Sequence, residues 1–276
     1  MNIVWGLLIA GAVGASAVAI MLLVRRHAPD GSFFSDGDRA SGVFGVLATG
    51  FSVLLGFIVF LAFSSYDSSR SGAETEALMV AQQAETAQSF PAPLGAELTG
   101  QLVCYGRTIV NDEWDRMRSG TLGDDLNPWG VRMFQALADY EPKTNHQQST
   151  YDQWLSQTAA REEARLDRIH GSAGVIPTTL WIVLFLIGGV IFGYMLFFAD
   201  SGERAVTQAM LMGSVMVVMT LLFLLLVALD NPFRGGVGSL KPAAMERTLR
   251  IIDNAVAVAD LKMTIPCDEA GVAEKS

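Results

Sequence analysis

Residues 175–198 read VIPTTLWIVLFLIGGVIFGYMLFF, and residues 206–229 read VTQAMLMGSVMVVMTLLFLLLVAL. Neither stretch contains a charged side chain. A bilayer core roughly 30 Å thick is crossed by about 20 apolar helical residues, so each stretch is long enough to span it. Because only residues 199–205 separate the two stretches, the pair predicts an antiparallel transmembrane hairpin.

Two further stretches of the same kind lie nearer the N-terminus, at residues 3–24 and 43–63. The first is followed by Arg25 and Arg26 rather than by a small-residue cleavage motif, so we interpret it as a retained anchor. The sequence therefore predicts an all-α, multi-pass membrane protein with four transmembrane helices. Its predicted divisions are residues 1–63 (the first two spans), 64–174 (a helical extramembrane domain), 175–229 (the last two spans) and 230–276 (a tail).

The extramembrane region between the second and third spans is acidic and helical in pattern. Residues 64–174 hold 16 Asp and Glu against nine Lys and Arg, within a total net charge of −9. This excess argues against nucleic acid as a partner. Helices are predicted at residues 64–90, continuous with the second span, and at 95–118, 127–140, 149–170 and 242–258. We expect the last ten residues to be frayed.

Several local patterns in this region give more specific expectations. Asn127 followed by Pro128 is typical of a helix N-cap, and Ser149 with Asp152 resembles a capping box. The charged segment 161–168 is typical of a solvated helix face. Glu113 is interpreted as the edge of an amphipathic helix.

Catalysis has little support in the chain. It holds three histidines and no nucleophile elbow, phosphate loop or zinc-binding helix. The predicted spans contain no Asp, Glu, Lys, Arg or His, which disfavours a proton-coupled transporter. We therefore expect no enzyme activity, no catalytic residues, no metal site and no cofactor.

The two cysteines, Cys104 and Cys267, fall on the same membrane face because an even number of spans separates them. Thiols stay reduced in cytosol and oxidise outside it, so pairing depends on the compartment. Two free thiols packed as small apolar groups are the competing interpretation.

The chain resembles a bacterial family of membrane proteins described as bestrophin-like. The residues that carry the resemblance are LLGF at 54–57, YDSSR at 66–70, Tyr105 with Val110, Glu113, Trp114 and Met117, AREEAR at 160–165 leading to LW at 180–181, and LDNPF at 229–233. Bestrophins themselves are pentameric anion channels. The resemblance thus implies a homo-oligomer in the lipid bilayer that passes ions.

In bestrophins the second span lines the pore neck with large apolar side chains, and the matching positions here are Thr49, Val53 and Phe57. Of these three positions, only Phe57 carries a large apolar side chain. The small and polar residues of this span, Gly45, Thr49, Ser52 and Gly56, fall close to one helical stripe. That stripe predicts either a close packing face between helices or one side of a narrow pore gated by dewetting.

Two functions of different classes follow. The favoured one is a homo-oligomeric ion channel; the alternative is a non-conducting scaffold or signalling protein whose helical domain binds a protein partner. We expect either to reside in the cell membrane. Arg25 and Arg26 after the first span place the 25–42 loop in the cytoplasm, and hence the helical domain outside it. The total of basic residues near the span ends, and the bestrophin analogy, favour the opposite orientation. We favour the domain outside the cytoplasm, because long domains cross the membrane largely regardless of their charge.

Overall fold

The computed structural model describes residues 2–122, 125–236, 238–258 and 263–274. The chain divides into two compact units. The membrane unit comprises residues 1–65, 174–231 and 236–238, and the extramembrane unit comprises residues 66–173, 232–235 and 239–276. Four helices are long and apolar enough to cross a membrane, and the described residues contain no β-strand. The predicted all-α class and the four predicted spans are confirmed.

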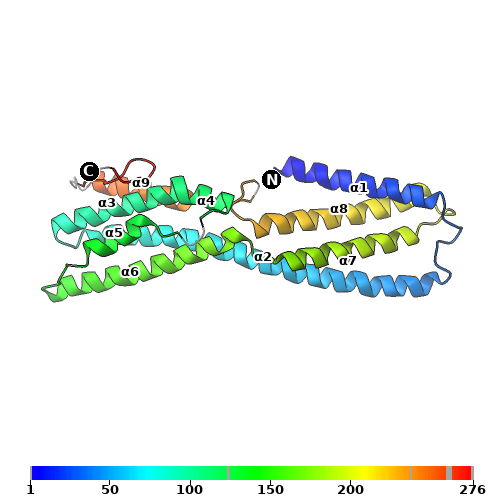
Figure 1. Ribbon diagram of the computed structural model, residues 1–276, viewed down its shortest axis with the longest axis horizontal. Helices are drawn as coiled ribbons and strands as arrows, with labels where there is room; N and C mark the ends of the chain where they lie inside the picture. The colour runs from blue at the N-terminus through cyan, green and yellow to red at the C-terminus, as the bar shows by residue number, and fades with distance from the viewer. Residues whose placement is uncertain (1, 123–124, 237, 259–262, 275–276) are drawn as a thin grey trace. The chain divides into compact units, whose positions relative to one another are not determined.

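The four spans are α1 (Ile3–Arg25), the first part of α2 (Gly37–Ala87), α7 (Thr178–Phe197) and α8 (Ala205–Asp230). α1 and α8 lie side by side (Figure 1). The absence of a side chain at Gly14 of α1 permits this close approach, because a Cβ there would lie 2.7 Å from the Val217 side chain of α8. The close contact that small residues allow between membrane helices therefore occurs at α1 and α8.

The other apolar core of the membrane unit is made of larger side chains. Phe51, Leu55 and Ile58 of α2 are buried on one helical face. They pack with Leu184 of α7 and Leu226 of α8. This face fixes which side of α2 is turned toward its own unit and which side is left exposed.

A buried carboxylate organises the start of α7. Asp230, at the end of α8, accepts hydrogen bonds from the backbone N–H groups of Val175 and Ile176, at 2.7 and 2.9 Å. Gly174 precedes them with a φ of +76°, a conformation that favours glycine. Asp230 thus pairs backbone donors that would otherwise be unsatisfied near a helix start.

The extramembrane unit contains the remainder of α2, with α3 (Ala92–Thr108), a π-helical segment (Ile109–Glu113), α4 (Trp114–Ser119), α5 (Pro128–Ala136), α6 (Asn145–His170), a 3-10 turn (Gly171–Ala173) and α9 (Ala243–Val258). α2 runs through 51 residues without interruption, as the sequence predicts. The cap at Asn127 is confirmed, because its side chain accepts from Trp129 N. The capping box at Ser149 is wrong: α6 begins one turn earlier, where Thr144 accepts from Gln147 N.

The π-helical segment explains a break in the periodicity of the sequence. Leu98, Leu102 and Ile109 are buried on one face. The next buried residues along the chain are Glu113, Trp114 and Met117. A π-bulge inserts one residue into a helical turn and shifts the phase of all that follow. The shift brings Trp114 and Met117 to the face that Ile109 occupies, whereas Glu113, four residues after Ile109, lies near that face by ordinary helical spacing.

Two glycines allow backbones to approach closely in this unit. A Cβ on Gly72 of α2 would lie 2.6 Å from the backbone nitrogen of Arg168 on α6. A Cβ on Gly100 of α3 would lie 2.3 Å from the carbonyl oxygen of Thr264. Gly72 is therefore a contact point between α2 and α6, and Gly100 a contact point between α3 and residues 263–274.

The region predicted as a separate tail belongs largely to the extramembrane unit. Met245 and Ile252 of α9 are buried in its core. Residues 266–274 form a tight hairpin, closed by hydrogen bonds from Asp268 N to Val272 O and from Glu274 N to Pro266 O. The expected fraying is wrong for the described residues, because this hairpin is paired internally and packed on α3 and α5.

Candidate functional site

The three pore-lining candidates lie on the exposed side of α2. Val53 is 55% exposed and Phe57 is 66% exposed, and Thr49 is exposed as well. All three lie roughly opposite the core face that contains Phe51 and Leu55. The described residues of one protomer therefore leave more than half of the Val53 and Phe57 side chains uncovered.

The small residues of α2 are divided between two surroundings. Ser52 and Gly56 line an apolar cavity of ≈ 540 Å³ together with residues of α7 and α8, whereas Gly45 does not line it. A Cβ on Gly45 or Gly56 would meet no atom within 4 Å. Among the described residues, no helix packs closely on Gly45 or Gly56.

The two cysteines are joined in the structure. Cys104 of α3 and Cys267 of the hairpin form a disulfide with a Cα–Cα distance of 5.8 Å. Both residues are buried in the core of the extramembrane unit. The bond fastens residues 263–274 to α3, near the point where Gly100 admits the backbone of Thr264.

A buried ionic cluster lies at the centre of the extramembrane unit, and the sequence reasoning missed it. We define the cluster as Glu76 of α2, Tyr105 of α3, Glu113 of the π-helical segment, and Arg165 and Arg168 of α6. All five residues are buried, and the Arg168 side chain is 0% exposed. The prediction that segment 161–168 forms a solvated helix face is wrong for its arginines.

Arg168 is held between two carboxylates. Its guanidinium is paired with Glu76, and its Nη2 donates to Glu113 Oε2 at 2.7 Å. Arg165 Nη2 donates to the other Glu113 oxygen at 3.0 Å, and Tyr105 Oη donates to Glu76 Oε1 at 2.6 Å. The two acids and two bases balance in charge, so burial leaves no uncompensated ion.

The cluster shifts the pKa values of Glu113, Tyr105 and Arg168. Burial alone would raise the pKa of Glu113, but Arg168 and Arg165 outweigh it and lower that pKa below its usual value. Burial, aided by the Glu76 carboxylate, raises the pKa of Tyr105 well above the ordinary range. Burial opposes the charge of Arg168, yet Glu76 and Glu113 raise the pKa of its guanidinium. The charged carboxylate of Glu113, the charged guanidinium of Arg168 and the neutral phenol of Tyr105 are thereby favoured.

The spacing of the arginines was the signal that could have revealed the cluster. Arg161, Arg165 and Arg168 lie at i, i+4 and i+7, which places them on one helical face with the buried Trp154. Leu166, an apolar residue of the same helix, is 67% exposed. The arginines, rather than the leucine, face the core.

Comparisons of the sequence and of the fold with known proteins agree on one family. The sequence model of the Bestrophin-like domain matches residues 3–245. No curated protein matches the chain. The fold is similar to that of a bacterial bestrophin homolog from Klebsiella pneumoniae, with a TM-score of 0.66 at 13% identity over 95% of this chain and 100% of that one.

A point mutant of the Klebsiella pneumoniae homolog gives a TM-score of 0.65 at 14% identity, covering 91% of this chain and 99% of that chain. At this level of identity the likeness establishes the fold alone. The match of the sequence model, which extends over most of the chain, establishes the family. The protein is a membrane protein that belongs to the bestrophin-like family.

Proposed function

We propose that the protein is a homo-oligomeric ion channel of the cell membrane in which α2 lines the pore at Thr49, Val53 and Phe57. The observation that carries the proposal is the exposure of these three side chains on the side of α2 turned away from its own core. Membership of the bestrophin-like family supports the same assignment.

The chemistry of the stripe defines how such a pore would work. A ring of Thr49 hydroxyls supplies dipoles, and rings of Val53 and Phe57 form an apolar constriction. Narrow apolar constrictions gate by dewetting, without a charged side chain. Ion selection would therefore depend on pore diameter and hydroxyl dipoles.

Self-association is supported by apolar side chains on the extramembrane unit. Leu126, Phe134 and Leu166 are 75%, 70% and 67% exposed in the single chain. Large side chains of this kind, when they form patches, mark interaction surfaces in soluble domains. Contacts between copies would remove them from water.

Planar-bilayer recording of the purified protein tests the proposal. Wild-type protein should conduct, and Phe57→Ala should change the single-channel conductance or open probability severalfold because it widens the apolar constriction. Phe185→Ala is the matched control, since Phe185 of α7 is also an exposed phenylalanine of the membrane unit, at 59%. The control should leave the current unchanged.

The alternative function, a non-conducting scaffold, predicts a different result. Well-folded oligomers that stay electrically silent under all tested ions and voltages would favour it and reject the channel. Equal effects of Phe57→Ala and Phe185→Ala would reject the assignment of α2 as the pore helix. Particle images that count subunits around an axis would establish the stoichiometry.

We further propose that the extramembrane unit lies outside the cytoplasm. The Cys104–Cys267 pair supports this orientation, because disulfides persist in oxidising compartments and are rare in cytosol. Arg25 and Arg26 after the first span support it independently through the positive-inside rule.

A further inference from the structure

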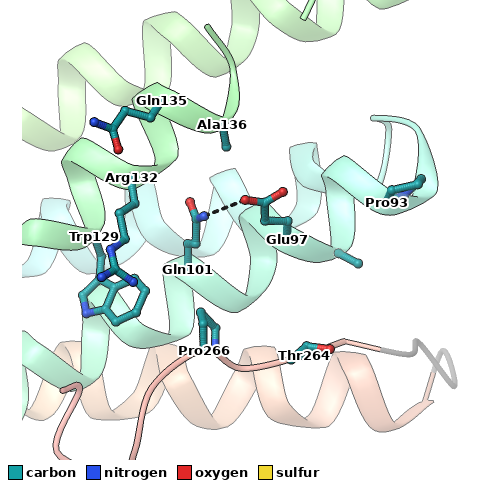
Figure 2. Close-up of a pocket in the computed structure, with 10 residues that line it drawn as sticks. Pro93, Glu97, Gln101, Trp129, Arg132, Gln135, Ala136, Thr264 and Pro266 are labelled. Carbon is teal, nitrogen blue, oxygen red and sulfur yellow. Dashed lines mark hydrogen bonds between the residues drawn. The ribbon is translucent and has the colours of Figure 1, made fainter. Parts of the chain in front are cut away.

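A cavity in the extramembrane unit lies apart from the proposed pore residues. Its volume is ≈ 670 Å³, and it is lined by α3, α5 and the segment containing Thr264 and Pro266 (Figure 2). Small-molecule sites in proteins commonly measure about 300–1,000 Å³ and combine apolar walls with a few placed polar groups. Its polar lining residues are Glu97, Gln101, Arg132, Gln135 and Thr264.

Gln101 provides the first indication of a ligand. The residue is 6% exposed, and its Nε2 donates to Glu97 Oε1 at 3.0 Å. Because an ionised carboxylate only accepts hydrogen bonds, this contact fixes the orientation of the amide. The Gln101 Oε1 atom then has no hydrogen-bond donor among the described residues. A buried acceptor without a partner costs free energy until a donor reaches it.

Arg132 provides the second indication, from the opposite wall. Its guanidinium lies over the Trp129 ring, 4.5 Å from the ring centroid. The indole is itself fixed, since Trp129 is buried and its Nε1 donates to Gly271 O at 2.8 Å. Figure 2 shows Arg132 descending from α5 onto this ring. The stacking orients the guanidinium and leaves its edge N–H groups available for an anion.

The two charges in the cavity are not neutralised within the described part of the chain. There, no ion pair within 4.0 Å joins Arg132 to a carboxylate, or Glu97 to a basic side chain. A simple anion would satisfy only Arg132, and a simple cation only Glu97. A ligand that carries both charges would satisfy both walls.

We propose that this cavity binds a small zwitterion, namely an α-amino acid or a short peptide. The ligand carboxylate is bound by the edge of the Arg132 guanidinium. The ligand ammonium donates to Glu97, and to the orphaned Gln101 Oε1 once a rotation of that side chain opens the atom to the cavity. Ala96, Ala136 and Pro266 provide apolar surface for the ligand side chain.

Calorimetric titration of the purified full chain, with its disulfide intact, tests the proposal. The probes are a panel of L-α-amino acids and glycylglycine. We expect at least one probe to bind. For each probe that binds, its N-acetyl form lacks the ammonium and its C-terminal amide lacks the carboxylate. Each derivative should bind at least about tenfold more weakly, as the loss of a charge-assisted hydrogen bond requires.

Variants locate the site. Arg132→Gln and Glu97→Gln should each weaken binding about tenfold or more, whereas Arg118→Gln, which alters an exposed arginine of α4, should bind as wild type. The proposal is overturned if no probe binds at millimolar concentration, if a derivative binds as well as its parent, or if Arg132→Gln binds as wild type. The derivative series uses unaltered protein, so it decides the question even where a variant folds poorly.

Discussion

At the scale of single residues, the most informative position is Arg168. Its side chain is fully buried and bridges Glu76 and Glu113, two acids that are 37 positions apart along the chain. Composition predicts charged residues on the surface, and for Glu163 and Asp167 of the same helix that expectation holds. It failed for Arg168 because a charge is buried when its partners are buried with it, and those partners lie on other helices.

The loss of thermal stability at acidic pH should depend on Glu113. A carboxyl whose folded-state pKa is lowered contributes stability above its unfolded pKa, and that stability is lost as pH falls through the folded pKa. The melting temperature of the purified protein should therefore decrease as pH is lowered from about 5 toward 3. Circular dichroism melts across this range would measure the decrease.

Two variants separate Glu113 from the other acids. Glu113→Gln should have a lower melting temperature than wild type at pH 7, because Arg165 and Arg168 lose a charged partner. Its melting temperature should also decrease less steeply as the pH is lowered from about 5 toward 3. Glu85→Gln, at an exposed position on α2, should keep the wild-type slope. An unchanged slope in Glu113→Gln would show that its carboxyl is not held in the charged state by this cluster.

At the scale of elements, hydropathy alone was enough to locate all four spans. A charge-free run of about 20 apolar residues is expected in a helix that crosses a membrane. The π-helical segment Ile109–Glu113 was harder to anticipate. Its trace in the sequence is a slip of the apolar pattern from Ile109 to Val110. That slip is visible locally, but the partners of the buried Glu113, Arg165 and Arg168, lie on α6 and leave no trace near residue 113.

The contact between α2 and α6 should be sensitive to one methyl group. In Gly72→Ala the new Cβ would lie 2.6 Å from Arg168 N and 2.7 Å from Ala164 O, both backbone atoms that cannot rotate away. Separation of the helices should cost about 1–3 kcal/mol, as for other overpacked sites. This loss exceeds the gain of about 1 kcal/mol in helix propensity. We expect a lower melting temperature.

The matched control is Gly189→Ala, in α7, where an added Cβ meets no atom within 4 Å. It should be neutral or slightly stabilising. A Gly72→Ala protein that melts at or above the wild-type temperature would show that the two backbones do not approach as closely as described.

At the scale of the whole molecule, the sequence did not reveal that residues 239–276 complete the extramembrane unit. A tail after the last span has no local pattern that specifies its partner. Its attachments, such as Thr248 Oγ1 donating to Ala77 O and the bond from Cys267 to Cys104, join positions more than 160 residues apart. Such contacts are settled by packing rather than by periodicity.

The proposed orientation makes two measurable predictions in cells. In the first, the cells are quenched with acid and the protein is denatured and treated with a mass-tagged maleimide. The maleimide should label no cysteine without reductant, and two cysteines after reduction. Separately, Glu85→Cys in a background of Cys104→Ser and Cys267→Ser should react with a membrane-impermeant maleimide in intact cells. Labelling of that reporter only after lysis would place the unit in the cytoplasm and reject the orientation.

The bond between Cys104 and Cys267 also imposes an order on biosynthesis. The two cysteines are 163 residues apart, and α7 and α8 are both made between them. At about 5–20 residues per second, the ribosome needs roughly ten to thirty seconds to deliver the second cysteine after the first. Throughout that interval, α3 has neither the segment containing Thr264, which packs on Gly100, nor a partner for its thiol. If the unit folds in an oxidising compartment, as proposed, we expect cross-links between two chains through Cys104 to compete with the native bond during this interval, and to accumulate in chains that end before residue 267.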